Sequence, residues 1–234
     1  MRGTIPEDAP ADAVLDDIRV LAPDVAIFRC PSGSTVQSAA LLGSGLVPLH
    51  ADTLVYYQGA LEQSGPVAPM KRSEEILRAV ASDGEGIAAV AHLAFSGYRS
   101  HYHANPRFGH DRILAGYVDW AIAYARPGQA GMDAWVVKRA GDAIGFATCR
   151  ADAKRAEVEI LLNAVHPDYS GQGIYTRLVA AMMNEYRHAG IRTIRVSTQA
   201  WNCRVQRAWI RLGLLPHHAL DTYHLNLPAR GAQA

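Results

Sequence analysis

The chain is poor in cysteine, and the cysteines it has lie far apart. Cys30, Cys149 and Cys203 are an odd number at wide spacing, which forms neither a disulfide framework nor the usual ligand set of a metal site. We therefore expect a protein of the reducing cytoplasm with no bound metal.

Basic runs and long apolar segments are also missing. The 234-residue chain has a formal net charge of +1, and no stretch interleaves basic with aromatic residues. This composition excludes a typical nucleic-acid-binding protein. The first residues are acidic and rich in proline and alanine, and no later segment is long enough to cross a bilayer. We expect no signal peptide, no nucleic-acid partner and no membrane partner.

Hydrophobic residues are plentiful, at 49% of the chain, which is enough for one large core or two small ones. The turn-rich segment 63–69 separates two regions. Residues 1–66 predict a small N-terminal α/β unit, and residues 67–234 predict a larger domain in which strands alternate with helices. This order predicts an α/β (α+β mixed) fold class with a mixed sheet covered by helices.

One segment carries a candidate anion site. A strand predicted over 156–165 leads into the loop Ser170-Gly171-Gln172-Gly173-Ile174, and a long helix follows. The two glycines let the backbone approach a ligand without a Cβ in the way. Successive N–H groups at the positive end of a helix suit a pyrophosphate. A lone G-x-G is more often only a tight turn, so its neighbours decide its weight.

Three neighbouring features raise that weight. The strand ends in Val165-His166-Pro167, where Pro167 cannot continue the ladder. Asn202 opens a helix after the next strand, and that helix ends in Ala208-Trp209-Ile210-Arg211-Leu212-Gly213. From about Ile76 to the C-terminus, this order resembles the GNAT superfamily of acyl-CoA-dependent N-acyltransferases. The resemblance implies an enzyme with a mostly antiparallel, twisted sheet flanked by helices, and acetyl-CoA or another short acyl-CoA as co-substrate.

A narrower resemblance extends into the N-terminal unit. Three phrases are similar to bacterial dTDP-fucosamine acetyltransferases: Arg195 to Gln199 followed by Asn202, Ala94-Phe95-Ser96 with Arg99, and Leu42 to Val47. Those enzymes acylate the amine of a dTDP-linked deoxy-amino sugar. The resemblance implies a nucleotide-linked (dTDP or UDP) deoxy-amino sugar as acceptor, direct attack in a ternary complex, and a homodimer.

The resemblance assigns acyl-CoA contacts to the loop and its flanks. The family loop usually reads [RQ]-x-x-G-x-[GA], so Ser170 replaces a basic or amide residue and Tyr175 replaces a small one. The backbone cradle needs only N–H groups and is intact. A strand N–H near Asn163 or Ala164 would point at the thioester carbonyl. The cofactor-binding residues predicted in this way are Asn163, Ala164, Val165, Ser170, Gly171, Gln172, Gly173, Ile174, Tyr175, Asn202 and Trp209.

Simpler interpretations of these positions stay open. Asn202 could be a plain helix N-cap, and Val165 a plain core residue. Similar enzymes carry a tyrosine at the position of Trp209, where it protonates the leaving thiolate. An indole N–H is far too weak an acid for that task, so Tyr175, Tyr223 or water takes over, or the coenzyme leaves as thiolate, since thiol pKa values lie near ~8.5. Trp209 could equally be a packing residue.

An amine must lose a proton as it attacks, so a general base is useful. In several superfamily members a glutamate at the position of Glu159 accepts the amine proton, directly or through water. Glu157 points the same way, because side chains alternate along a strand, and both could be solvated. The predicted catalytic residues are Glu159, His103, Tyr175 and Tyr223.

The loop 98–108, rich in Tyr, His and Arg, is the expected acceptor-binding segment. Its arginines could pair with a diphosphate, and its histidines could bind a sugar hydroxyl or take the amine proton. A polar surface loop is the alternative. The predicted substrate-binding residues are Arg99, His101, Tyr102, His103, Arg107 and Gln199.

Two other functions stay open at this level. One is acetylation of a peptide or protein N-terminus, or of an antibiotic amine. The other is a non-catalytic acyl-CoA-binding regulatory domain, for which the departures at Ser170, Tyr175 and Trp209 would argue.

Overall fold

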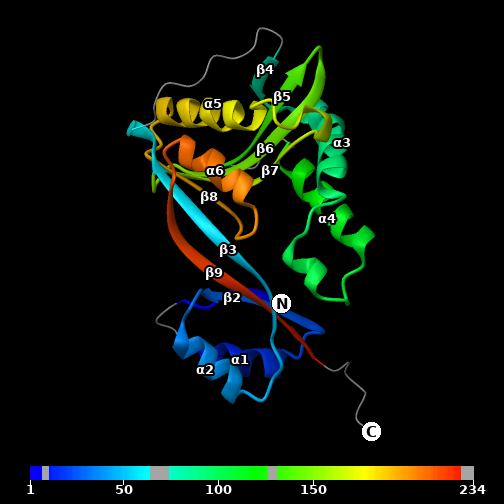
Figure 1. The fold of residues 1–234 in the computed structure, drawn as a ribbon, viewed down its shortest axis with the longest axis vertical. Helices are drawn as coiled ribbons and strands as arrows, with labels where there is room; N and C mark the ends of the chain where they lie inside the picture. The colour runs from blue at the N-terminus through cyan, green and yellow to red at the C-terminus, as the bar shows by residue number, and fades with distance from the viewer. Residues whose placement is uncertain (7–10, 64–73, 126–130, 228–234) are drawn as a thin grey trace.

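A computed structural model describes residues 1–6, 11–63, 74–125 and 131–227 of the chain (Figure 1). Its helices, including short 3-10 turns marked η, and its strands are, in chain order, β1 (Arg2–Thr4), α1 (Ala11–Leu21), β2 (Val25–Pro31), α2 (Thr35–Gly43), β3 (Leu49–Ala60), η1 (Leu61–Gln63), β4 (Glu74–Arg78), η2 (Ala81–Asp83), α3 (Gly84–Phe95), η3 (His101–Ala104), α4 (His110–Ala123), β5 (Met132–Arg139), β6 (Asp142–Asp152), β7 (Glu157–Val165), η4 (Pro167–Tyr169), α5 (Ile174–His188), β8 (Thr193–Gln199), α6 (Cys203–Arg211) and β9 (Leu215–Asn226).

The described strands form one nine-stranded sheet in the order β1-β2-β9-β3-β8-β7-β6-β5-β4. The pairs β1–β2 and β7–β8 are parallel, and the other neighbours are antiparallel. The sequence-based prediction of a mixed, mostly antiparallel sheet flanked by helices is therefore confirmed.

Helices cover both faces of the upper sheet (Figure 1). The α5 stripe of Ile174, Leu178, Met182 and Tyr186 is buried in one core with Trp209 of α6. Helices α3 and α4 build a second core on the other face. A third core lies under α1 and α2 at the far end of the sheet. None of the described helices is long and apolar enough to cross a membrane.

The two predicted regions share this sheet. Strand β3 pairs with β8, and the C-terminal strand β9 lies between β2 and β3. Figure 1 shows β3 and β9 running side by side from the α1–α2 end into the upper part of the molecule. The predicted boundary at 66/67 falls outside the described residues, so the division into two domains stays a prediction.

The two central parallel strands separate partway along their length. Strands β7 and β8 pair from Glu157 with Thr193 to Ile160 with Val196, and the register ends there. Beyond this point β7 continues to Val165 and β8 to Gln199. The gap that opens between the two strands positions the candidate site.

Candidate active site

A cavity of about 1070 Å³ opens where β7 and β8 separate, and we call it the central cavity. Its walls come from the ends of β7 and β8, the loop 169–173, both helices α5 and α6, helices α3 and α4, and strands β1, β2 and β3. Most of the predicted site residues line it, namely His101, Tyr102, Glu159, Asn163, Ala164, Val165, Ser170, Gly171, Gly173, Ile174, Tyr175, Gln199, Asn202 and Trp209.

The glycine loop forms a cradle at the start of α5. Gly171 and Gly173 have φ angles of 82° and 75°, a region that residues with a Cβ rarely adopt. Gly173 is the residue before the first turn of α5, so the loop leads directly to the unpaired N–H groups of that helix. This geometry fits the pyrophosphate of an acyl-CoA.

Buried charges hold the loop in place. Glu74 of β4, only 4% exposed, accepts hydrogen bonds from Arg177 at 2.5 Å and Arg139 at 2.7 Å. Arg177 also donates to the backbone oxygen of Gln172 at 3.0 Å, and Arg139 donates to its side-chain oxygen at 3.2 Å. The pairing with arginine keeps the pKa of Glu74 low despite its burial. Gln172, predicted to contact the cofactor, instead contacts Arg139 and Arg177 and does not line the central cavity.

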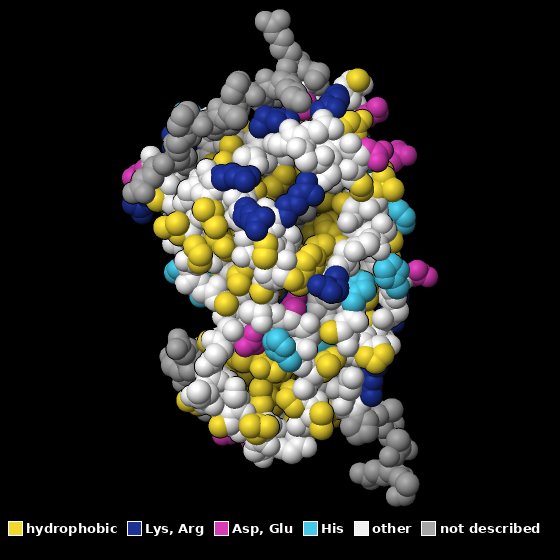
Figure 2. Space-filling model, in the orientation of Figure 1, with side chains coloured by type: hydrophobic (Ala, Val, Ile, Leu, Met, Phe, Trp, Pro, Cys, Tyr) yellow, Lys and Arg dark blue, Asp and Glu magenta, His cyan; other side chains and the backbone are white. Residues whose placement is uncertain are grey.

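An arginine lies where the loop lacks its usual basic residue. Arg204 of α6 lines the central cavity, and its Nη2 is 3.8 Å from the position that a Cβ on Gly171 would occupy. Arg204, Arg207 and Arg211 are exposed on α6. Figure 2 shows Lys and Arg side chains gathered over this helix, beside a hollow in the surface. The guanidinium of Arg204 thus lies beside the loop, where Ser170 offers only a hydroxyl in place of the basic or amide residue.

The open edge of β7 presents the N–H groups of alternate residues. The Leu162 N–H donates to Thr148 Oγ1 at 3.1 Å, and the His166 N–H donates to the Ile144 oxygen at 2.9 Å, so both point toward β6. Because successive N–H groups of a strand point to opposite edges, the Asn163 N–H points toward the gap, whereas that of Ala164 points toward β6. Of the two predicted oxyanion donors, the geometry favours Asn163.

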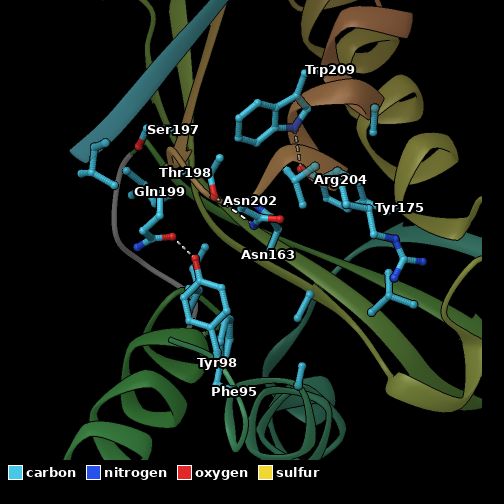
Figure 3. Close-up of a pocket in the computed structure, with 18 of the residues that line it drawn as sticks. Phe95, Tyr98, Asn163, Tyr175, Ser197, Thr198, Gln199, Asn202, Arg204 and Trp209 are labelled. Atoms are coloured by element: carbon cyan, nitrogen blue, oxygen red, sulfur yellow. Dashed lines mark hydrogen bonds between the residues drawn. The ribbon is translucent and has the colours of Figure 1, made fainter. Parts of the chain in front are cut away.

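Tyr175 and Trp209 form a pair inside the central cavity. The indole N–H of Trp209 donates to the Tyr175 hydroxyl at 2.7 Å (Figure 3). Trp209 is fully buried. Burial raises the pKa of the Tyr175 phenol well above its usual range, so the hydroxyl keeps its proton at neutral pH. The hydrogen bond from Trp209 thus fixes the position of the Tyr175 hydroxyl in the wall of the central cavity.

Asn202 does not act as a side-chain N-cap. Its Nδ2 donates to Thr198 Oγ1 at 3.0 Å, and it makes no capping bond to the first turn of α6 (Figure 3). Because Thr198 holds its amide nitrogen, its amide oxygen is oriented within the wall of the central cavity. This favours the predicted role as a ligand over the role as a simple cap.

The two glutamates of β7 separate into different roles. Glu157 forms an ion pair with Arg195 at 2.9 Å and does not line the central cavity. Glu159 is half-buried and does line it. Burial raises the pKa of Glu159, although Arg150 and Arg195 partly offset this effect. A raised pKa makes the Glu159 carboxylate a better proton acceptor than an ordinary glutamate.

The expected acceptor loop contributes some of its predicted residues. The Tyr98 hydroxyl donates to Gln199 Oε1 across the central cavity (Figure 3). His101 is 6% exposed, and its Nδ1 is 2.9 Å from His224 Nε2. Burial and the nearby arginines lower the pKa of His101 to about 3. A histidine with so low a pKa is too weak a base to hold an amine proton.

Four further predicted residues lie away from the central cavity. His103 caps η3 by accepting the Ser100 N–H at 3.2 Å. Arg107 donates to the backbone oxygens of Asp24 and Leu227, so it fastens the loop to the end of β9. Tyr223 stacks on Phe28 against the α1–α2 core. These placements argue against both roles predicted for His103, catalytic and substrate-binding, against the catalytic role predicted for Tyr223 and against the substrate role predicted for Arg107.

Arg99 is the fourth, at the edge of the site. Its guanidinium carbon lies 5.1 Å from the ring centroid of Trp201, which is 44% exposed and lines the central cavity. It therefore does not reach inside as a diphosphate ligand within the described structure.

The sequence reasoning missed several residues of the wall. Arg2, Arg29 and Tyr56 come from the N-terminal strands, and Tyr117 and Trp120 come from α4. A signal existed for the α4 pair, because the helix shows aromatic residues at helical spacing. Nothing local marks the N-terminal residues, since their place depends on pairing with β9. Among the described residues, no group of His, Cys, Asp and Glu side chains could hold a metal ion.

Known proteins share this fold. A GCN5-related N-acetyltransferase from Kribbella flavida superposes with a TM-score of 0.61 at 17% identity, over 97% of this chain and 79% of the other. A GCN5-related N-acetyltransferase from Sphaerobacter thermophilus superposes with a TM-score of 0.61 at 16% identity, over 91% of this chain and 64% of the other. This chain therefore spans less than two thirds of that protein. A tandem GNAT protein from the clavulanic acid biosynthesis pathway superposes with a TM-score of 0.61 at 11% identity, over 94% of this chain and 69% of the other. No curated protein sequence matches the chain.

The sequence itself settles the family. Residues 88–214, more than half of the chain, match the acetyltransferase (GNAT) family. This range includes the glycine loop, the separated ends of β7 and β8, and the Tyr175–Trp209 pair. The chain belongs to the acetyltransferase (GNAT) family.

Proposed function

We propose that this chain transfers an acetyl or other short acyl group from coenzyme A to the amine of a nucleotide-linked deoxy-amino sugar, by direct attack in a ternary complex. The observation that carries the proposal is that Glu159 and the open edge of β7 at Asn163 face one cavity. They would supply a proton acceptor and an N–H donor to the same cavity.

The donor half of the central cavity fits a bound acyl-CoA. Its thioester supplies the electrophilic carbonyl carbon. The loop N–H groups at Gly171 and Gly173, with Arg204, would hold the pyrophosphate. The open edge of β7 would bind the pantetheine amides as an added strand does.

The acceptor half is lined by rings. Its walls include Tyr56, Tyr98, Tyr102, Tyr117, Trp120 and Trp201. Aromatic faces suit the flat apolar surfaces of sugars and nucleotide bases. At about 1070 Å³, the central cavity exceeds the volume range of roughly 300–1,000 Å³ that is typical of single-ligand pockets, which agrees with a cavity that holds a donor and an acceptor together. The rings support an acceptor larger than a simple amine.

The catalytic steps follow from three side-chain and backbone groups. Glu159 would accept the proton of the attacking amine, directly or through water. The Asn163 N–H would stabilise the charge that develops on the carbonyl oxygen. The Tyr175 hydroxyl would donate a hydrogen bond to the departing sulfur. Because the phenol pKa lies above that of a thiol, near ~8.5, hydrogen bonding is favoured over complete proton transfer.

The cysteines support direct attack without an acyl-enzyme. None of Cys30, Cys149 and Cys203, all in the described part of the chain, lines the central cavity. Burial raises the pKa of Cys30 to about 11, so its thiolate is scarce at neutral pH. A covalent route would need a thiolate at the thioester.

Thiol release from acetyl-CoA tests the proposal. Purified protein is assayed with dTDP- and UDP-linked amino sugars, with the matching free amino sugars, and with peptides, and the variant Gly173→Asp is the matched control. We expect turnover with the nucleotide-linked amines and none from the variant. Turnover with peptides alone would refute the sugar assignment. Tight acetyl-CoA binding without any turnover would leave the regulatory acyl-CoA-binding function instead.

A further inference from the structure

Two arginines from the N-terminal strands line the acceptor end of the central cavity. Arg2 lies on β1 and Arg29 on β2. Strands β9, β3 and β8 separate β2 from β7, which carries the glycine loop at its end. The two guanidiniums are therefore distinct from Arg204 and the donor cradle.

Both arginines are held in position by neighbouring side chains. The guanidinium carbon of Arg2 lies 5.0 Å from the ring centroid of Tyr102. Arg29 Nε is 3.4 Å from Thr222 Oγ1 on β9. Neither contact neutralises a charge, because a ring and a hydroxyl are both neutral.

Carboxylates neutralise other arginines of this chain but not these two. Ion pairs hold Arg78 to Asp133, and Arg139 and Arg177 to Glu74. Among the described residues, no carboxylate oxygen lies within ion-pair distance of Arg2 or Arg29.

Asp52 is the nearest candidate for a carboxylate that could neutralise Arg29. It follows Arg29 and Thr222 in one row across β2, β9 and β3, yet it forms no ion pair with Arg29. Burial raises the pKa of its carboxyl, although Thr222 and the charge of Arg29 partly offset this effect. The positive charges of Arg2 and Arg29 act on the buried His101, because both arginines help to lower its pKa.

The two arginines and the proposed base share the acceptor half. Glu159 lines the same cavity, and the charge of Arg29 acts on its carboxyl. An acceptor whose amine lies at Glu159 would thus extend toward Arg2 and Arg29. Two unpaired guanidiniums at that end favour a phosphate or carboxylate, which bind arginine with paired hydrogen bonds.

We propose that Arg2 and Arg29 form an anion subsite that selects acceptors carrying a phosphate or carboxylate group in addition to the amine. The proposal rests on the proposed function for the identity of the amine end. The anion subsite itself is a property of these two side chains and can be measured without turnover.

Calorimetry with inorganic pyrophosphate and with succinate tests the subsite and separates the two anion sources. The titrations are made with coenzyme A present in excess and, in parallel, on the Gly173→Asp variant, so that the donor loop does not bind the probe. Arg2→Gln and Arg29→Gln are compared with Arg155→Gln, an exposed arginine outside the cavity wall. We expect each cavity variant to lower the affinity for the preferred anion by roughly 10- to 100-fold, as for loss of a charged hydrogen-bonded contact. The Arg155→Gln control should bind the anion with wild-type affinity.

Equal binding of both anions by wild type and all three variants, or no binding by wild type, would overturn the subsite. Thiol-release kinetics then tests its use: the cavity variants should raise the KM of the phosphorylated or carboxylated amine and leave that of the free amino sugar unchanged. Anion binding that depends on Arg2 and Arg29, without turnover of any amine, would refute the proposed function and leave the subsite standing.

Discussion

Replacing Tyr175 by phenylalanine tests the pair that occupies the place of the family's usual acid. The fully buried Trp209 would keep its indole N–H but lose the acceptor at 2.7 Å. An unsatisfied buried donor costs about 1–3 kcal/mol. We therefore expect the Tyr175→Phe protein to lose about 1–3 kcal/mol of unfolding free energy in urea titrations at pH 7.

A double-mutant cycle isolates the hydrogen bond from packing. Trp209→Phe removes the donor, so in the Tyr175→Phe background it should cost about 1 kcal/mol less than it does alone. In parallel, the turnover number of Tyr175→Phe should fall roughly 10- to 100-fold, as expected for one lost hydrogen bond to a developing charge. Additive stability effects, together with an unchanged turnover number, would refute the assignment of Tyr175.

Four further outcomes follow. Gly173→Asp should abolish acyl-CoA binding, measured by calorimetry, because a carboxylate replaces the open approach to the phosphates; unchanged affinity would refute the loop assignment. Arg204→Gln should lower the affinity for acyl-CoA by about tenfold, as for loss of one charged contact, whereas the Arg155→Gln control should keep wild-type affinity. Glu159→Gln should lower turnover, and wild-type kcat/KM should rise with pH through a pKa above the usual carboxyl range; an acid limb at the ordinary value would contradict this. The free energy of unfolding should fall as pH drops from about 6.5 to about 4, because the unfolded chain protonates at His101 and His224 before the folded protein, whose pKa values are about 3 and 4, does; a flat profile between those pH values would contradict the buried pair.

The donor half of the site could be predicted from the sequence because its determinants are local. The glycine loop, the strand before it and the helix after it are contiguous, and the structure brings them together as expected. The pairing of Trp209 with Tyr175 was less visible, since it joins two helices. The sequence showed only that one residue is unusually large at each position.

The acceptor half could not be predicted from the sequence, because it depends on long-range strand pairing. Tyr223 was expected in the site, but its neighbours Thr222 and His224 face that side, and a shift of one residue reverses the face. By residue type alone Arg107 could be a diphosphate ligand, but in the structure it donates to two backbone oxygens. The predicted homodimer and the cytoplasmic location stay predictions.

The place of β9 between β2 and β3 has a consequence for how the molecule is made. Arg29 and Thr222 meet across that strand although 193 residues separate them along the chain. During synthesis β2 can pair with β1, but it must wait for β9 until the elements from α2 to α6 have left the ribosome. Strands β4 to β8 can assemble before that, and β9 then closes the acceptor end of the central cavity.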